Sequence, residues 1–600
     1  MKRRNWSQFD QLRDQLDAYP LAVYLDYYRV ESRLRHTSGD AAVLFMEASN
    51  DTPLQLRFKG KYLRRAGRDR RWQDYLQVAT EEPQDITLQC YYYRAKVQAG
   101  EKEEAWAAAQ RLWNYGKSRP DACDPLFDGW MKAVQLEDAL IWQRMLKAFD
   151  ARRGGLIGYV AELGSEEIQT WGELMLTMYR HPASLNQSSL LPPDSPYAVD
   201  IVAHGMPRLA RVDVAHALRL WKRYQSRYPF TASQRHRIAD GIARYSILRQ
   251  EKAHTAWLDD YLVGRGDDQL LESRVRWAIK QADWPVLVKL LPGLSEERKQ
   301  ANVWRYWRAH ILAVEGELTA ANAQWQALAR ERDYYGFLSA ERLGQAPSLN
   351  HRPLVLSQAV SGVAQQPGVL RAAELLYHDK PQLAQSEWRY LLQGQEDAYK
   401  EALSHHAIQQ GWYRFAIDAA NDAGAWDRLE LRFPSPYQDV FSRYAQIYSV
   451  PDTELLSIAR RESAFMPTAH SGVGARGLMQ LMPRTARSVA KGLGDAGLTR
   501  NLYDVEANIT LGGAYYRQLL DSYAGNRVLT LAAYNAGPYR VKRWRNKAAK
   551  GVSVEQWVES IPIKETREYV QGVLAYNVVY NGLRQQDTPL FKELEVQARY

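Results

Sequence analysis

The feature that most constrains the fold is a long series of apolar stretches with helical spacing across residues 10–343. Strand-like alternation of apolar and polar residues is scarce. One unit recurs in residues 91–113 and 304–325: an aromatic-rich helix, a Gly-Glu turn, and an alanine-rich helix beginning near Ala105 or Ala320. Small residues let two helices approach closely while aromatic rings fill the neighbouring gap. Because the spacing between copies is irregular, the pattern predicts an irregular helical solenoid in an all-α protein.

The chain has two places where the helical pattern lapses. Residues 345–368 and 432–438 are rich in Pro, Ser and Gly or contain closely spaced prolines. Such stretches are typical of domain boundaries. A chain of 600 residues is also too long for one ordinary hydrophobic core. After residue 438 the sequence has more glycine, shorter predicted helices and clustered motifs, so we expect the chemistry there.

Composition and charge exclude several classes of protein. Lysine plus arginine number 79 against 69 for aspartate plus glutamate, which gives a net charge of +10. This modest excess attracts polyanions weakly, but no dense basic block accompanies it, so we expect no nucleic-acid binding. No apolar run is long enough to span a membrane, which predicts peripheral or no membrane association. The first residues show no export signal, which fits a cytoplasmic protein or a chain whose signal has been removed.

The two cysteines, Cys90 and Cys123, lie on either side of a predicted helical hairpin. They are either two buried free thiols or a disulfide that would require an oxidising compartment. No CxxC motif or histidine-rich cluster is present. The sequence therefore predicts no metal site.

A single carboxylate precedes the richest motif cluster. A helix is predicted to start at residues 451–453, and Leu455, Ile458, Ala459 and Glu462 then share one apolar stripe. Burial on that stripe would raise the pKa of Glu462, as a general acid working near neutral pH requires. The alternative is a solvated glutamate at the helix end that pairs with a neighbouring arginine.

Three further stretches follow in order. Residues 471–483, SGVGARGLMQLMP, combine glycines that permit close approach of a ligand with an amide beside methionines, which suits a sugar. A plain loop leading into a buried helix explains the same residues. Residues 530–541, TLAAYNAGPYRV, close a helix at a glycine, and residues 560–576 place Glu565, Arg567 and Tyr569 on another helix.

Together these motifs resemble the soluble lytic transglycosylases, bacterial murein-cleaving enzymes with a goose-type lysozyme-like catalytic domain. The resemblance rests on Glu462-Ser463 and on the runs at residues 477–480, 533–538 and 565–570, and it extends over the whole chain. It implies a superhelical, U-shaped helical domain at 1–360, a helical linker domain closing a ring at 361–432, and a lysozyme-like catalytic domain at 433–600. It also implies a periplasmic location and a disulfide between Cys90 and Cys123.

The resemblance implies cleavage of the β-1,4 bond between N-acetylmuramic acid and N-acetylglucosamine, with intramolecular attack that gives 1,6-anhydromuramyl products, and exo action. Glu462 would be acid and then base. By the same resemblance Ser471 would bind the N-acetyl group, and Gln480 and Met482 would line the glycan. Tyr534 would form a hydrogen bond to Glu462. Glu565 would bind sugar or assist electrostatically. No cofactor is implied. Arg461 stands where close relatives often carry glutamine, which affects the expected charge around Glu462.

Two other functions are compatible with parts of the sequence. A hydrolytic muramidase needs a second carboxylate to hold water, and Glu565 is the candidate for it, although a charge at a helix start explains Glu565 equally. A non-catalytic helical scaffold that binds glycan would not need the acid. The expected partners are peptidoglycan glycan strands, muropeptides, and proteins of cell-wall synthesis or remodelling.

Overall fold

The protein is built from α-helices, as the sequence predicts. The computed structural model describes residues 6–134, 136–355, 362–546 and 551–600. Within those ranges it contains no strand, only isolated bridges that pair His470 with Arg476 and Arg476 with Leu481. The chain divides into two compact units: unit 1 comprises residues 1–258 and 370–390, and unit 2 comprises 259–369 and 391–600.

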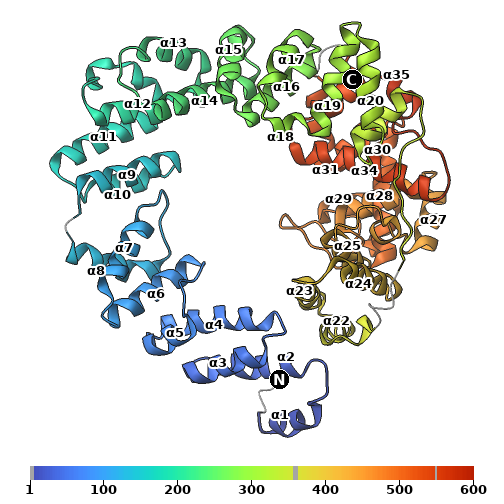
Figure 1. Ribbon diagram of the computed structural model, residues 1–600, viewed down its shortest axis with the longest axis horizontal. Coiled ribbons are helices and arrows are strands. Elements are labelled where there is room, and N and C mark those ends of the chain that lie inside the picture. The colour runs from blue at the N-terminus through green and yellow to red at the C-terminus, as the bar shows by residue number, and fades with distance from the viewer. Residues whose placement is uncertain (1–5, 135, 356–361, 547–550) are drawn as a thin grey trace. The chain divides into compact units, whose positions relative to one another are not determined.

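Unit 1 is a succession of short helices, each packed mainly on its neighbours in sequence, as the blue-to-green part of Figure 1 shows. This is the arrangement of a solenoid. Its helices are α1 (Trp6–Arg13), α2 (Ala22–Glu31), α3 (Gly39–Ala48), α4 (Leu54–Arg68), α5 (Trp72–Val78), α6 (Ile86–Gln98), α7 (Lys102–Trp113), α8 (Asp124–Ala133), α9 (Asp138–Asp150), α10 (Gly154–Ala161), α11 (Glu166–Arg180), α12 (Pro196–Val212), α13 (Val214–Tyr224) and α14 (Ala232–Arg249). Three helices cross the division between the units: α15 (Thr255–Arg265), α22 (Pro367–Tyr377) and α23 (Pro381–Leu392).

Unit 2 begins with further helical hairpins and ends with the motif-bearing helices. The first group is α16 (Asp268–Gln281), α17 (Trp284–Leu290), α18 (Glu296–Lys299), α19 (Asn302–Val314), α20 (Leu318–Leu328), α21 (Tyr334–Arg342), α24 (Asp397–Gln409), α25 (Tyr413–Asp422) and α26 (Leu429–Arg432). The second is α27 (Gln438–Ile447), α28 (Asp452–Ser463), α29 (Pro483–Leu493), α30 (Val505–Ser522), α31 (Arg527–Ala536), α32 (Pro538–Arg545), α33 (Val554–Glu559), α34 (Lys564–Leu583) and α35 (Glu593–Gln597). No α-helix lies between α21 and α22 among the described residues, which agrees with the predicted break.

The recurring hairpin of the sequence is formed by α6 with α7 and by α19 with α20. Gly100 and Gly316 end the first helix of each pair at φ 91° and 90°, in the left-handed region that favours glycine. The second helices start at Lys102 and Leu318, earlier than the predicted Ala105 and Ala320. The reason is that the glycine alone reverses the chain, so the residues after the Gly-Glu turn already lie in the first turn of the next helix.

A disulfide bond joins Cys90 of α6 to Cys123, which ends a short 3-10 helix at Asp121–Cys123. The two residues are 33 positions apart, and both are fully buried. Since α7 lies between them in sequence, the bond closes a loop around the α6–α7 hairpin.

We expect loss of this disulfide to destabilise unit 1. Replacing both Cys90 and Cys123 by alanine should lower the free energy of unfolding by about 2 to 4 kcal/mol, because the unfolded chain is no longer constrained by the closed loop. Thermal unfolding of the double variant, compared with wild type in the absence of reductant, measures the effect. A midpoint equal to that of wild type would show that the bond adds nothing to stability.

Within unit 2, α33 fixes the motif-bearing helices to the hairpin helices. Glu559 accepts hydrogen bonds from Arg276 of α16 at 2.7 Å and from Tyr335 of α21. Glu555, one turn earlier, accepts from Tyr306 of α19 at 3.1 Å and from Arg342 of α21. Both carboxylates are buried, so removing one partner would leave an uncompensated charge.

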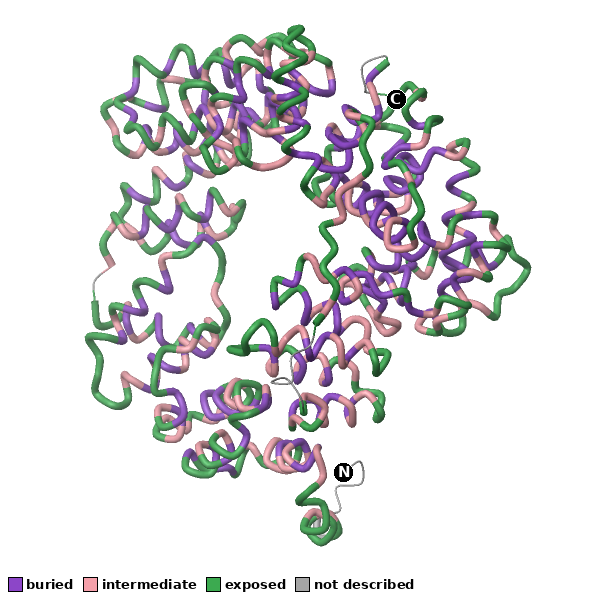
Figure 2. Tube along the Cα trace, turned by 45° about the vertical axis from the view of Figure 1, so that its right-hand side comes forward, coloured by how far each residue is buried: buried purple, intermediate pink, exposed green. Residues whose placement is uncertain are grey.

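The helices α28, α31 and α34 carry motif residues and pack together. Helix α34 contacts both α28 and α31. Figure 2 shows buried and exposed residues alternating along the chain. In α28 and α34 most residues are buried. Side chains of α28 that point toward the contact with α34 therefore face protein rather than water.

Candidate active site

Helix α28 delivers Glu462 to the buried side of the fold. The helix begins after Pro451 and ends when Ala464 turns to a left-handed conformation at φ 50°. Leu455, Ile458 and Ala459 are fully buried and Glu462 is half-buried, as the predicted stripe requires. No ion pair joins Glu462 to an arginine in the described part of the chain, and Arg460 instead donates to the carbonyl oxygen of Arg432 at 2.8 Å. The structure thus favours the buried acid over the solvated glutamate.

The surroundings of Glu462 raise the pKa of its carboxyl group into the neutral range. Burial is the main cause that raises its pKa to about 7, and the negative charge of Glu565 adds to the rise. The hydroxyl of Tyr569 and the charge of Arg461 lower the pKa but do not cancel the effect of burial. A carboxyl group with this pKa can donate a proton at pH 7 and take one back.

Tyr569 is a site residue that the sequence analysis did not assign. Its hydroxyl is buried on α34 and forms no hydrogen bond of good geometry. Burial raises the pKa of Tyr569 most, and the charge of the nearby Glu462 and a hydrogen-bonding contact with it raise the pKa further. Hydrogen bonds of catalytic groups are often long before substrate binds. The available signal was its position four residues after Glu565, which places both on one face of α34.

Tyr534 occupies a different role from the predicted one. Its hydroxyl donates to the backbone carbonyl oxygen of Met479 at 2.9 Å, so the predicted hydrogen bond to Glu462 is absent and Tyr569 faces the acid instead. The Met479 carbonyl needs a donor because the chain turns at Gln480, whose φ is 48°. The charge of Glu462 still contributes to the raised pKa of Tyr534, so the two side chains are neighbours.

The loop between α28 and α29 is fixed by hydrogen bonds. Ser471 accepts from the Ala475 backbone N–H through its hydroxyl at 2.9 Å, which leaves the hydroxyl proton able to point to a ligand. Ser463 donates to the Leu478 carbonyl oxygen at 2.7 Å, and Asn508 of α30 accepts from the Met479 N–H at 2.8 Å. The loop is therefore tied to the helix that carries Glu462 and to α30.

Gly477 is required where the loop meets α30. Its φ is 79°, and a β-carbon there would overlap the Leu502 carbonyl oxygen and the Asn508 amide. Since the first obstacle is backbone, no side-chain rotation relieves it. Gly477 thus permits the close packing of the loop against Leu502 and Asn508.

The remaining predicted substrate residues lie on the same loop and on α34. Gln480 donates through its amide nitrogen to the carbonyl oxygens of Gly477 at 2.9 Å and Ala469 at 3.2 Å. Met482 is 42% exposed at the start of α29. Glu565 is exposed in the first turn of α34, and its charge acts on Glu462. The structure thus gathers Glu462, Tyr534, Tyr569 and Glu565.

Arg461 lines a hollow beside the acid. The hollow has a volume of about 380 Å³, and Glu568 and Gly572 of α34 also line it. Arg461 is exposed, and its charge lowers the pKa of Glu462. Arg461 therefore limits the rise in the pKa of Glu462 that burial causes.

Neither a metal centre nor a membrane span is found among the residues that the structure describes. No group of three or more His, Cys, Asp or Glu side chains there could hold a metal ion. No helix there is both long and apolar enough to cross a membrane.

We expect the two tyrosines to have distinguishable effects. Tyr569→Phe removes a hydroxyl that lowers the pKa of Glu462, so the pH above which activity falls should move upward. Tyr534→Phe removes the hydrogen bond to Met479 and should reduce the free energy of unfolding by about 1 kcal/mol while leaving that pH nearly unchanged. Activity against pH and thermal unfolding of both variants measure this. Equal pH shifts in both would contradict the assignment.

Comparison with known proteins places this site in a defined class. Residues 439–554 match the family model described as the transglycosylase SLT domain, and 362–429 match the soluble lytic murein transglycosylase L domain. Residues 560–589 match the soluble lytic transglycosylase helical domain. These matches identify the chain as an enzyme of the lytic transglycosylase type.

Relatives of similar length extend the match to the whole chain. The soluble lytic murein transglycosylases of Salmonella typhimurium and Escherichia coli K12 are each 30% identical over 603 residues, which covers 100% of this chain and 93% of theirs. The crystal structure of the 70 kDa soluble lytic transglycosylase of E. coli matches with a TM-score of 0.89 at 30% identity, over 100% of this chain and 97% of that one. The chain belongs to the soluble lytic murein transglycosylase family.

Two further solved structures concern the function of relatives. One is the complex of the 70 kDa soluble lytic transglycosylase with bulgecin A, with a TM-score of 0.88 at 30% identity, over 100% of this chain and 97% of that one. The other is the lytic transglycosylase Slt of Pseudomonas aeruginosa as an inactive glutamate-to-glutamine mutant, with a TM-score of 0.87 at 32% identity, over 99% of this chain and 97% of that one. A glutamate is thus essential in that relative.

Proposed function

We propose that this protein cleaves the β-1,4 bond between N-acetylmuramic acid and N-acetylglucosamine in peptidoglycan and forms 1,6-anhydromuramyl products. The observation that carries the proposal is Glu462, a half-buried carboxyl group whose pKa is raised to about 7. A typical glycosidase uses two carboxylates. One carboxyl group suffices when the nucleophile is a hydroxyl of the substrate itself, because that group can act as acid and then as base.

In the proposed reaction Glu462 first donates its proton to the glycosidic oxygen while the bond from the anomeric carbon to that oxygen breaks. The 6-hydroxyl oxygen of the same muramyl residue then bonds to the anomeric carbon, and its proton passes to the Glu462 carboxylate. No water is consumed, and Glu462 returns to its starting state. Tyr569, whose hydroxyl faces the acid, would orient the carboxyl group during both transfers.

The other site residues would hold the glycan. Ser471 would donate its free hydroxyl proton to the substrate N-acetyl group, since its oxygen already accepts from Ala475. Gln480 would bind sugar hydroxyls through its amide oxygen because its amide nitrogen is used within the loop. The exposed Met482 would contact an apolar sugar face, and Tyr534 would support the loop from below.

A hydrolytic muramidase is the second candidate, and one observation favours it. Glu565 is exposed and near enough to act on the pKa of Glu462, so it is the carboxylate that could hold a water molecule. The proposal instead gives Glu565 the role of sugar contact or electrostatic aid. The two candidates differ in whether water enters the product.

The proposed function also includes a division into domains, a cellular location and protein partners. The chain would comprise a superhelical domain at 1–360, a linker domain at 361–432 and a catalytic domain at 433–600. It would work on glycan strands in the periplasm, where murein lies in bacteria with two membranes, and would act from strand ends. Proteins of cell-wall synthesis or remodelling would be its protein partners.

Release of soluble fragments from purified murein tests the proposed cleavage directly. We expect wild type to release muropeptides and to do so without added metal or cofactor. Sedimentation of protein with insoluble murein, measured in the same samples, separates binding from cleavage. Sedimentation without release would instead support a glycan-binding scaffold.

A further inference from the structure

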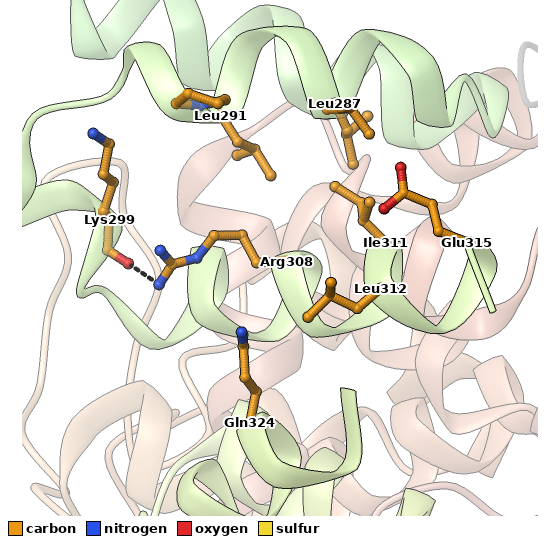
Figure 3. A pocket seen from close by; sticks show the side chains of 10 residues that line it. Leu287, Leu291, Lys299, Arg308, Ile311, Leu312, Glu315 and Gln324 are labelled. Atoms are coloured by element: carbon orange, nitrogen blue, oxygen red, sulfur yellow. Dashed lines mark hydrogen bonds between the residues drawn. The ribbon is translucent and has the colours of Figure 1, made fainter. Parts of the chain in front are cut away.

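A trough in the helical hairpins of unit 2 is distinct from the catalytic residues. It lies between α17 with the short 3-10 helix Leu291–Gly293 on one side and α19 with α20 on the other. Its volume is about 400 Å³. Figure 3 shows Leu287 and Leu291 above the trough and Ile311 and Leu312 below it.

The walls of the trough are apolar, whereas its ends are charged. Leu287, Leu291 and Ile311 are buried, while Val288 at the rim is 43% exposed. Figure 3 shows Lys299 and Arg308 at one end and Glu315 at the other. Apolar walls with a few placed polar groups are typical of sites for small molecules.

Arg308 has hydrogen-bonding capacity that the protein does not use. One terminal nitrogen donates to the Lys299 carbonyl oxygen at 3.0 Å, the bond drawn in Figure 3. Its Nε atom is buried and has no hydrogen-bond partner. In the described part of the chain Arg308 forms no ion pair, and the nearby Lys299 ammonium is already paired with Glu296 at 2.8 Å. The guanidinium therefore lines the trough with a positive charge that no ion pair of the described residues neutralises.

We propose that the trough binds an amphiphilic carboxylic acid, with the carboxylate on Arg308 and the apolar chain between α17 and α19. Guanidinium and carboxylate match in charge and in planar geometry, and the terminal nitrogens of Arg308 still have donors after the bond to Lys299. The four leucine and isoleucine side chains cover the chain of the ligand. Glu315 at the far end repels a carboxylate, which fixes the direction of binding.

Calorimetric titration of the full chain with decanoate tests this proposal. We expect saturable binding of one decanoate, and weaker binding of decyltrimethylammonium, which has a similar chain length and the opposite charge, because Arg308 repels its head group. Arg308→Met keeps much of the apolar stem and removes the charge, so decanoate affinity should fall about tenfold or more. Val288→Trp should block the rim and also weaken binding.

Arg305→Met is the matched control, because Arg305 lies on the same helix and donates to Asn302 at 2.8 Å instead of lining the trough. It should bind decanoate like wild type. Unchanged circular dichroism of Arg308→Met excludes unfolding as the cause of its weaker binding. Absence of saturable binding, equal affinity of Arg308→Met and wild type, or equal binding of the cationic amphiphile would each overturn the proposal. The assay does not involve murein cleavage, so its result is independent of the proposed activity.

Discussion

Glu462→Gln should lower the rate of murein cleavage by about a thousandfold or more, because the same group serves as acid and as base in the proposed reaction. Glutamine has nearly the shape of the protonated carboxyl group but cannot donate the proton. Binding of murein should persist, since the loop of Ser471 and Gln480 does not depend on Glu462 for its hydrogen bonds. Fragment release and cosedimentation measure the two properties separately.

The same substitution should stabilise the fold above neutral pH. The pKa of Glu462 is raised from 4.5 to about 7 in the folded state, so between these values the unfolded chain has lost a proton that the folded protein keeps. Wild type therefore loses stability as pH rises through this window, by up to about 3 kcal/mol at pH 8. Glutamine carries no such penalty. Chemical denaturation at pH 4 and pH 8 measures the difference, and a variant that is less stable than wild type at pH 8 would contradict the assigned burial.

The second large effect is the dependence of activity on pH. Protonated Glu462 is required for the first step, and its pKa is about 7. Activity should therefore be nearly constant below that pH and fall about tenfold for each further unit above it. Initial rates of fragment release from pH 5 to 9, with folding checked at each pH, measure this fall in activity. A profile that stays flat to pH 9 would mean that Glu462 is not the acid.

Removing either of two neighbouring charges should shift the pH at which activity falls, in opposite directions. Arg461→Gln removes a positive charge that lowers the pKa of Glu462, so the fall in activity should begin at higher pH. Glu565→Gln removes a negative charge that raises the pKa, so the fall should begin at lower pH. Because both variants replace a charge by the same neutral amide, they control for each other. Shifts of the same sign would show that the fall in activity is due to titration of a group other than Glu462.

Much of the fold followed from local patterns. The stripe of Leu455, Ile458 and Glu462 predicted which side of α28 is buried, because helical period depends only on sequence spacing. The hairpins followed from glycines at which the chain turns with positive φ, as at Gly100 and Gly316. These features depend on neighbours in sequence, so a single chain was enough to predict them.

The partners of the tyrosines could not be predicted in the same way. Tyr534 and Tyr569 lie on different helices, and which hydroxyl faces Glu462 depends on how α31 and α34 pack on α28. The motif predicted that Tyr534 lies near the acid. Its hydroxyl donates to the Met479 carbonyl oxygen, however, because that backbone group needs a donor. Likewise, the contacts of Glu559 with Arg276 and Tyr335 join residues more than two hundred positions apart, for which no local pattern exists.

The central claim, cleavage without water, is tested most directly by running the reaction in water enriched in oxygen-18 and measuring the masses of the released muropeptides by mass spectrometry. The proposal predicts fragments one water molecule lighter than the hydrolysis products and free of the isotope, made by wild type and absent with Glu462→Gln. Full-mass fragments that carry the heavy oxygen would identify a hydrolase and point to Glu565 as the residue that holds the attacking water.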